Sequence, residues 1–199
     1  MKKLKIAIFD PARLVPGGGQ KVMPKIAEHL SKKHDVTLFM QSPPVYGFGN
    51  AKLKIIKPTN RFLAPLAFLR ASLKKSDFDI MILGCSANLV ALRNSHIPSI
   101  HISHTPPRFF YDLKKEMIKN ANFLGKFVIY GQNIFLKKLD YFGARKCTKI
   151  LAVSKEVQKR IKSCYGRESE LFYVGVDPSK FKTGRYDNYV LSVGRLVWT

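Results

Sequence analysis

Short apolar runs alternate with amphipathic stretches along most of the chain. Leu4–Phe9 is the first apolar run, and its branched and aromatic residues predict a buried strand. Apolar residues then recur at helical spacing and predict a helix over residues 19–33. The same pattern predicts strands at 35–40, 52–56, 79–83, 98–103, 149–153 and 189–193, and helices at 62–75 and 87–93.

Prolines and glycines affect where the predicted helices are expected to begin or to break. Pro24 fits only the first turn of a helix, so the first helix is expected to begin nearer Met23. Residues 114–142 are apolar and basic with helical spacing, and we expect that helix to break near Gly125 or Gly131.

The last predicted helix has a clear start and stop. Ser154 follows a strand at an N-cap position, and Gly166 stands where a C-cap belongs. Strands that alternate with helices predict an α/β fold with a parallel sheet. Ligands bind at the carboxyl ends of such strands. Functional residues are therefore expected in the loops that follow strands, at 10–19, 84–88, 104–112 and 194–199.

Charge narrows the classes of partner. The chain has 199 residues, with 35 Lys and Arg against 13 Asp and Glu, so its net charge is +22. A field of this sign attracts phosphates on nucleic acids, anionic lipids or sugar nucleotides. No nucleic-acid-binding motif is present and the lysines are scattered, so we expect no nucleic acid partner. A basic surface without a specific anionic partner is the alternative.

Cysteine usage and hydropathy bear on the compartment. Cys85, Cys147 and Cys164 form no CxxC pair, which argues against a disulfide framework or a thiol metal site and favours a reducing compartment. The first residues do not resemble a signal peptide, and no apolar run approaches the roughly 18–20 residues that span a bilayer. We therefore expect a cytoplasmic protein.

A glycine triplet, Gly17–Gly19, separates the first strand from the first helix. Glycines let the backbone approach a phosphate or a sugar closely, and a helix amino terminus offers free N–H groups. The segment matches neither the dinucleotide-binding nor the P-loop pattern. By itself the triplet is also compatible with a flexible loop.

A second candidate segment, 103–112, follows the strand at 98–103 and contains two prolines. The prolines would stiffen the turn and hold His104 and Arg108 in fixed directions. Histidine can donate a hydrogen bond or a proton near neutral pH, and arginine can bind a phosphate or carboxylate through two N–H groups. In the alternative interpretation, His104 only ends a strand and Arg108 is a surface charge. We expect His101 to be structural.

Three further motifs occur in order. They are Ala152-Val153-Ser154 at a strand-to-helix turn, Gly175-Val176-Asp177 followed by Phe181, and Gly194-Arg195-Leu196. Together with the glycine loop and the strand that ends near His104, they resemble the retaining family 4 glycosyltransferases across essentially the whole chain. The resemblance implies the amino-terminal, Rossmann-like half of a GT-B fold.

The resemblance also implies roles for particular residues. Gly18 and Gly19 would lie near the donor phosphates or the transferred sugar, His104 would act beside that sugar as the catalytic residue, and Arg195 would contact the donor diphosphate. Arg108 and Ser154 are further candidates for substrate binding. The donor would be a nucleotide-diphosphate sugar and the acceptor a glycan or a lipid-linked acceptor. No cofactor and no metal are expected.

The resemblance also divides the chain into two parts. Residues 1–172 would form the acceptor-side domain, and 173–199 the interdomain segment and the first strand of a donor-binding domain. Val174 replaces the usual Asn before Gly-Val-Asp, and the family's phosphate-binding Lys would come directly after Thr199. We therefore expect a truncated half of a hexosyltransferase, inactive alone. A non-catalytic module that binds only an acceptor or a partner is the alternative.

Two finer expectations concern the donor and the membrane. His-Thr-Pro-Pro-Arg at 104–108 is similar to a subgroup that often acts on mannose-type donors. The basic segment 114–142 could lie on an anionic membrane, where a lipid-linked acceptor would be presented, and the protein would then be peripheral at the inner face. A helix pair with a solvated basic face is the alternative.

Overall fold

The computed structural model describes residues 2–11, 17–58, 64–113, 118–119, 122–185 and 187–193. Within these residues a single parallel sheet contains seven strands in the order β3-β2-β1-β4-β5-β6-β7. The strands are β1 (Lys5–Asp10), β2 (Asp35–Met40), β3 (Lys52–Ile55), β4 (Ile80–Gly84), β5 (Ser99–Ser103), β6 (Lys149–Ala152) and β7 (Glu170–Leu171). The strand order runs outward in both directions from β1 and β4, as in a Rossmann-like fold.

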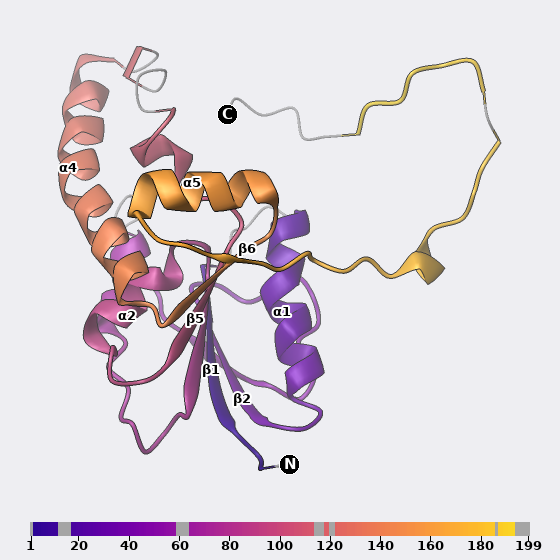
Figure 1. Ribbon diagram of the computed structural model, residues 1–199, viewed down its shortest axis with the longest axis horizontal. Coiled ribbons are helices and arrows are strands. Elements are labelled where there is room, and N and C mark those ends of the chain that lie inside the picture. The colour runs from indigo at the N-terminus through magenta and orange to yellow at the C-terminus, as the bar shows by residue number, and fades with distance from the viewer. Residues whose placement is uncertain are drawn as a thin grey trace.

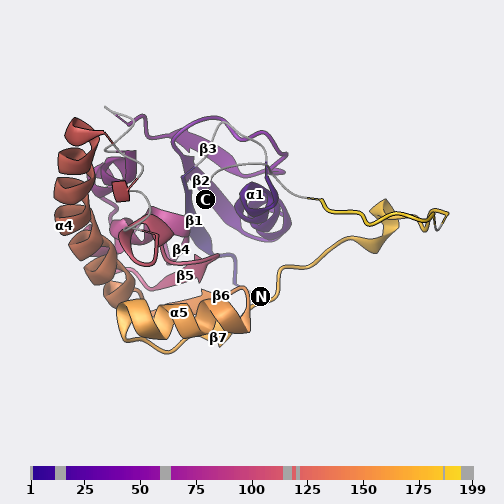
Figure 2. The same cartoon turned by 90° about the horizontal axis from the view of Figure 1, so that it is seen from above.

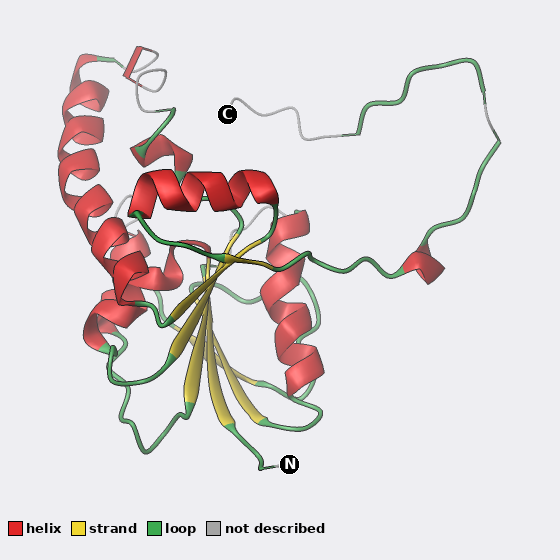
Figure 3. Cartoon of the chain, in the orientation of Figure 1, coloured by secondary structure: helices red, strands yellow, loops and turns green. Residues whose placement is uncertain are grey.

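Helices cover both faces of the sheet (Figures 1 and 2). Helix α1 (Gly18–Leu30) lies on one face, and α2 (Val90–Arg93), α4 (Phe123–Lys146) and α5 (Lys155–Tyr165) lie on the other. Short 3₁₀ helices occur at Ala64–Arg70, Cys85–Leu89, Arg108–Phe110 and Pro178–Lys180. Figure 3 shows that all of the strands lie in this one sheet between the helices. The expected α/β fold with a parallel sheet is confirmed.

Apolar strand residues divide between two cores, one on each face. Ile6 and Ile8 of β1 pack with Met23 and Ala27 of α1. On the other face Phe9 is fully buried and stacks on Phe39, with ring centroids 4.4 Å apart. Successive residues of a strand point to opposite faces, so the near-continuous apolar run of β1 fills both cores.

Two predictions about helix α1 and helix α4 were wrong. Pro24 lies well inside α1, which begins at Gly18, and its ring is buried. Burial of this helix face offsets the one hydrogen bond that a proline removes. Helix α4 continues through Gly125 and Gly131 without a break, because a glycine weakens a helix by only about 1 kcal/mol and does not by itself end it.

The predicted helix at 62–75 is only the 3₁₀ helix Ala64–Arg70, while its first two residues lie outside the described part of the chain. The predicted strand at 189–193 was also wrong, since no strand forms there. Val190 is 99% exposed, and the segment after β7 extends away from the sheet (Figure 1). A strand needs a neighbour for its backbone hydrogen bonds, which β propensity alone does not supply.

The signals at the ends of α5 were read correctly. Ser154 Oγ accepts a hydrogen bond from the Val157 backbone N–H at 3.2 Å, and Gly166 adopts the left-handed conformation with φ +61°. Both residues suit their positions, since the serine hydroxyl can cap a helix start and glycine, which lacks a Cβ, tolerates a positive φ. The division of the chain at residue 172 stays a prediction.

Candidate functional site

The carboxyl ends of β1, β4 and β5 meet at one edge of the sheet. Helix α1 begins at this edge with Gly18 and Gly19, and His104 follows β5 directly. A Cβ atom placed on Gly19 would lie 3.6 Å from Cδ2 and 3.8 Å from Nε2 of His104. The structure therefore brings together two of the residues that the sequence singled out, although 85 positions separate them in the chain.

Cys85 contacts the other side of the His104 ring. Its Sγ lies 3.7 Å from Nδ1 of His104, whereas Nε2 is buried and has no hydrogen-bond partner among the described residues. Burial lowers the pKa of His104, so the imidazole is neutral at pH 7. If the Cys85 thiol donates its proton to Nδ1, the ring hydrogen lies on Nε2 and can be donated to a ligand hydroxyl.

The backbone around Cys85 is unusual. Cys85 has φ +43°, the only positive φ of a non-glycine residue in the described part of the chain. The preceding Gly84 packs so closely that a Cβ there would lie 2.9 Å from the Met23 side chain and 3.2 Å from Oδ1 of Asp10. The end of β4 therefore packs closely against Met23 of α1 and Asp10 of β1, and Cys85 follows it directly. The loop 84–88 was among those expected to carry functional residues, but no signal in the sequence distinguishes Cys85.

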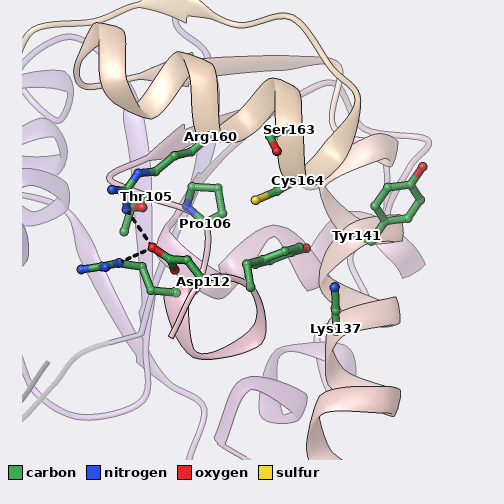
Figure 4. A pocket seen from close by; sticks show the side chains of 10 residues that line it. Thr105, Pro106, Asp112, Lys137, Tyr141, Arg160, Ser163 and Cys164 are labelled. Atoms are coloured by element: carbon green, nitrogen blue, oxygen red, sulfur yellow. Dashed lines mark hydrogen bonds and ion pairs between the residues drawn. The ribbon is translucent and has the colours of Figure 1, made fainter. Parts of the chain in front are cut away.

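Arg108 forms an ion pair beside a cavity of about 570 Å³. Its Nε donates to Oδ2 of Asp112 at 2.9 Å, and Arg160 Nη1 lies 3.6 Å from the same oxygen (Figure 4). Thr105 and Pro106 line the same cavity, which therefore begins one residue beyond His104. Lys137 and Arg160 of the cavity wall are residues that sequence analysis missed, because α4 and α5 bring them here from distant parts of the chain.

The remaining candidates have different surroundings. The Ser154 hydroxyl caps α5, which gives it a structural role. Among the described residues, nothing lies within 4 Å of a Cβ placed on Gly18. Arg195 lies outside the described residues. His101 is fully buried, its Nδ1 lies 3.0 Å from the Leu83 carbonyl oxygen, and burial lowers its pKa to about 4, so its expected structural role is confirmed.

Neither a metal cluster nor a membrane-spanning helix is found in the part of the chain that the structure describes. No three His, Cys, Asp or Glu side chains there are grouped so that they could hold a metal ion. None of the described helices combines the length and the apolar character that a bilayer span requires.

Comparison with known proteins identifies the family to which these features correspond. The model of Glycosyltransferase Family 4 matches residues 16–180, which is most of the chain. A comparison with curated protein sequences finds no match.

The solved structures of HepE from Anabaena are similar in fold. The structure with UDP-glucose has a TM-score of 0.58 and 13% identity, covering 91% of this chain and 46% of HepE. The structure with UDP and glucose has a TM-score of 0.56, again with 13% identity, covering 91% of this chain and 47% of HepE. The chain thus spans about half the length of HepE, and the likeness shows the Rossmann-like fold of one half of a GT-B glycosyltransferase.

Proposed function

The chain belongs to glycosyltransferase family 4, and we propose that the edge around Gly19 and His104 is the sugar-facing side of a nucleotide-sugar transfer site. The observation that carries this proposal is the position of Gly19 against the imidazole of His104 at the carboxyl ends of the strands. Ligands of open α/β sheets bind at that edge. HepE, which has the same fold, was solved with UDP-glucose.

His104 is proposed to hydrogen-bond the transferred sugar and to stabilise the charge that develops as the sugar leaves the diphosphate. The ring is neutral, and its Nε2 lies on the side of Gly19. A fixed donor in a buried site stabilises such charge without having to reorganise during the reaction. Gly18 and Gly19 would let the backbone at the start of α1 approach the donor phosphates. Arg195 is proposed to contact the diphosphate.

The proposed reaction is transfer of a hexosyl group with retention of configuration to a glycan or a lipid-linked acceptor. It uses no metal ion, since cationic side chains are proposed to carry the diphosphate charge. The sugar is proposed to be mannose-like, because residues 104–108 are similar to those of a subgroup that often acts on mannose-type donors. NMR spectroscopy of the first-formed product distinguishes retention from inversion by its anomeric coupling constant.

The test measures donor turnover for a panel of UDP, GDP and ADP sugars. The 199 residues are compared with the product of the complete reading frame, and we expect transfer only from the latter. His104→Ala should lower kcat about 100-fold, whereas His29→Ala, which removes an exposed histidine of α1, should leave it unchanged. If the complete protein turns over none of the donors, the proposal is wrong.

Gly19 supplies a geometric test of the same site. The Cβ of Gly19→Ala would lie at ordinary van der Waals distance from His104, so this variant should keep most of its activity. The longer side chain of Gly19→Leu would extend over the imidazole and should lower kcat about 100-fold. Equal effects of the two substitutions would contradict the proposed position of the sugar.

A peripheral membrane location at the inner face is proposed for α4. Tyr130, Ile134, Lys138 and Phe142 recur at four-residue spacing and are exposed, so they share one face of the helix. Apolar and basic groups on one face favour an anionic bilayer surface. Co-sedimentation with anionic vesicles tests this location, and a lack of binding even at low salt would exclude it.

A further inference from the structure

The cavity beside Arg108 lies where three elements meet. The segment after β5 forms one wall, and α4 and α5 form the others. Figure 4 shows Arg160 and Asp112 joined on one side, with Lys137 and Tyr141 projecting from α4 on the other. Its volume of about 570 Å³ is within the range of small-molecule sites. Thr105 lines it, so the cavity begins one residue after His104 in the chain.

Positive charge predominates around the cavity. Arg108, Arg160 and Lys137 line it, and Asp112 is its only lining carboxylate among the described residues. Arg160 Nε also lies 3.4 Å from Oε1 of Glu156, just outside the lining, so these groups together leave an excess of one positive charge. Although partial burial raises the pKa of Asp112, the hydrogen bond and charge of Arg108 outweigh it and lower the pKa, so Asp112 is ionised at pH 7. One carboxylate therefore holds two guanidinium groups close together.

Lys137 lies apart from this ion pair. Its Nζ is 4.8 Å from the centre of the Tyr111 ring, and it forms no ion pair with a carboxylate in the described part of the chain. The Tyr111 hydroxyl is anchored to Oδ2 of the buried Asp140 at 3.1 Å. The aromatic wall under Lys137 is therefore held in place, which orients the ammonium group over it.

Thr105, which lines the cavity, follows His104 directly in the chain. Its Oγ1 is buried and has no hydrogen-bond partner among the described residues. A buried hydroxyl without a partner is costly, so such atoms are commonly satisfied by a ligand or an ordered water. The groups that line the cavity thus include two guanidinium groups, an ammonium group and the side chains of Tyr111 and Tyr141.

We propose that this cavity binds a phosphate group carried by the sugar acceptor, with the acceptor's sugar ring against the tyrosines and one hydroxyl directed toward His104. This inference rests on the proposed function. Arg160 and Lys137 hold the phosphate, because guanidinium and ammonium groups both bind phosphate oxygens through charge-assisted hydrogen bonds. The phosphate is part of either a soluble sugar phosphate or a lipid headgroup.

Calorimetry on the 199-residue chain tests the cavity without any donor. Glucose 6-phosphate and glucose are titrated at physiological salt, and only the phosphate ester should bind. Lys137→Gln and Arg160→Gln should each weaken that binding about fivefold. The matched controls are Lys146→Gln in α4 and Lys159→Gln in α5, which remove the same charge from exposed residues outside the cavity and should change the affinity less than twofold.

Two results would overturn the inference. Equal losses in the cavity variants and in their controls would show that the phosphate binds only to the general basic field of the protein. Equal binding of glucose and glucose 6-phosphate would show that no phosphate subsite exists. All four side chains are at least partly exposed, so we expect the variants to fold. Circular dichroism of each variant checks this.

A second arm identifies the source of the phosphate. Vesicles that contain phosphatidylinositol are compared with soluble glucose 6-phosphate, and loss of vesicle binding in the cavity variants but not in the controls assigns the cavity to a lipid headgroup. Loss confined to glucose 6-phosphate assigns it to a soluble acceptor. Binding of either kind without sugar transfer by the complete protein would leave the cavity assignment intact and refute only the proposed function.

Discussion

Replacement of Asp140 measures how strongly one buried carboxylate holds α4 against its neighbours. Asp140 is 3% exposed. Asn88 Nδ2 donates to its Oδ1 at 2.9 Å, and the hydroxyls of Tyr165 and Tyr111 donate to Oδ2 at 2.9 and 3.1 Å. These partners come from the Cys85–Leu89 helix, from α5 and from the segment after β5. A single side chain therefore connects α4 to three other parts of the molecule.

Asp140→Ala should lower the free energy of unfolding by about 3 kcal/mol. The largest loss comes from Tyr165, which is 1% exposed and would keep a buried hydroxyl without its acceptor. Asn88 retains its second bond, to the Asp140 backbone oxygen at 2.9 Å. The half-buried Tyr111 lines the cavity, where water can replace the lost carboxylate. The loss of stability should therefore be well below the cost of leaving three buried polar groups without a hydrogen-bond partner.

Asp140→Asn separates shape from charge. An amide at this position can accept from Asn88 and donate to the tyrosine oxygens, so the loss at pH 7 should be below about 1 kcal/mol. Burial raises the pKa of Asp140 above its usual 3.8 despite three hydrogen-bond donors. The native state therefore binds a proton more tightly than the unfolded chain does. Its stability falls as the pH rises from 3.8 through the raised pKa.

Urea unfolding followed by circular dichroism, at pH 7.5 and at several values down to pH 4, checks both effects. The wild-type protein should gain stability relative to Asp140→Asn as the pH falls, because only the wild-type carboxyl takes up a proton. The Ala variant should be the least stable of the three at pH 7.5. Equal losses for Ala and Asn, or a wild-type to Asn difference that does not change with pH, would refute the reasoning.

Three further predictions concern single atoms or groups. Gly143→Ala should lower the free energy of unfolding by about 1–3 kcal/mol, since its Cβ would meet the backbone of Asn88 at 2.9 Å. Gly131→Ala, whose Cβ would have no atom of the described residues within 4 Å, should raise it by up to about 1 kcal/mol in the same urea assay. Ser154→Ala should cost about 1 kcal/mol, and a smaller loss than 0.3 kcal/mol would contradict its capping role. Cys85→Ser should preserve the tautomer of His104, and Cys85→Ala should change it, as measured by ¹⁵N NMR. If the His104 signals of Cys85→Ala and of the wild-type protein are identical, the thiol does not determine the tautomer.

The sequence by itself determined the α/β fold and its first and middle strands. Leu4–Phe9 and 98–103 are apolar, branched and bounded by turn residues, so local propensity and burial agree there. The caps of α5 were also readable, because the hydrogen bond of Ser154 and the positive φ of Gly166 are local properties of those residues.

The order of the strands and the meeting of Gly19 with His104 could be anticipated only in part. The carboxyl-end rule selected the right loops, but it does not specify which of them touch. That depends on β1 and β5 both lying beside β4 in the sheet. Cys85 was missed for the same reason, since its contact with His104 joins the residues that follow two different strands.

Only the tertiary structure decided the cavity and the limits of the sheet. Arg108, Lys137 and Arg160 are separate surface charges in the sequence, and the packing of α4 and α5 on the sheet makes them one cavity wall. Residues 189–193 have strand propensity but no neighbouring strand in the described part of the chain. Propensity and capping depend on a few adjacent residues, whereas cavities and strand pairing depend on contacts between distant ones.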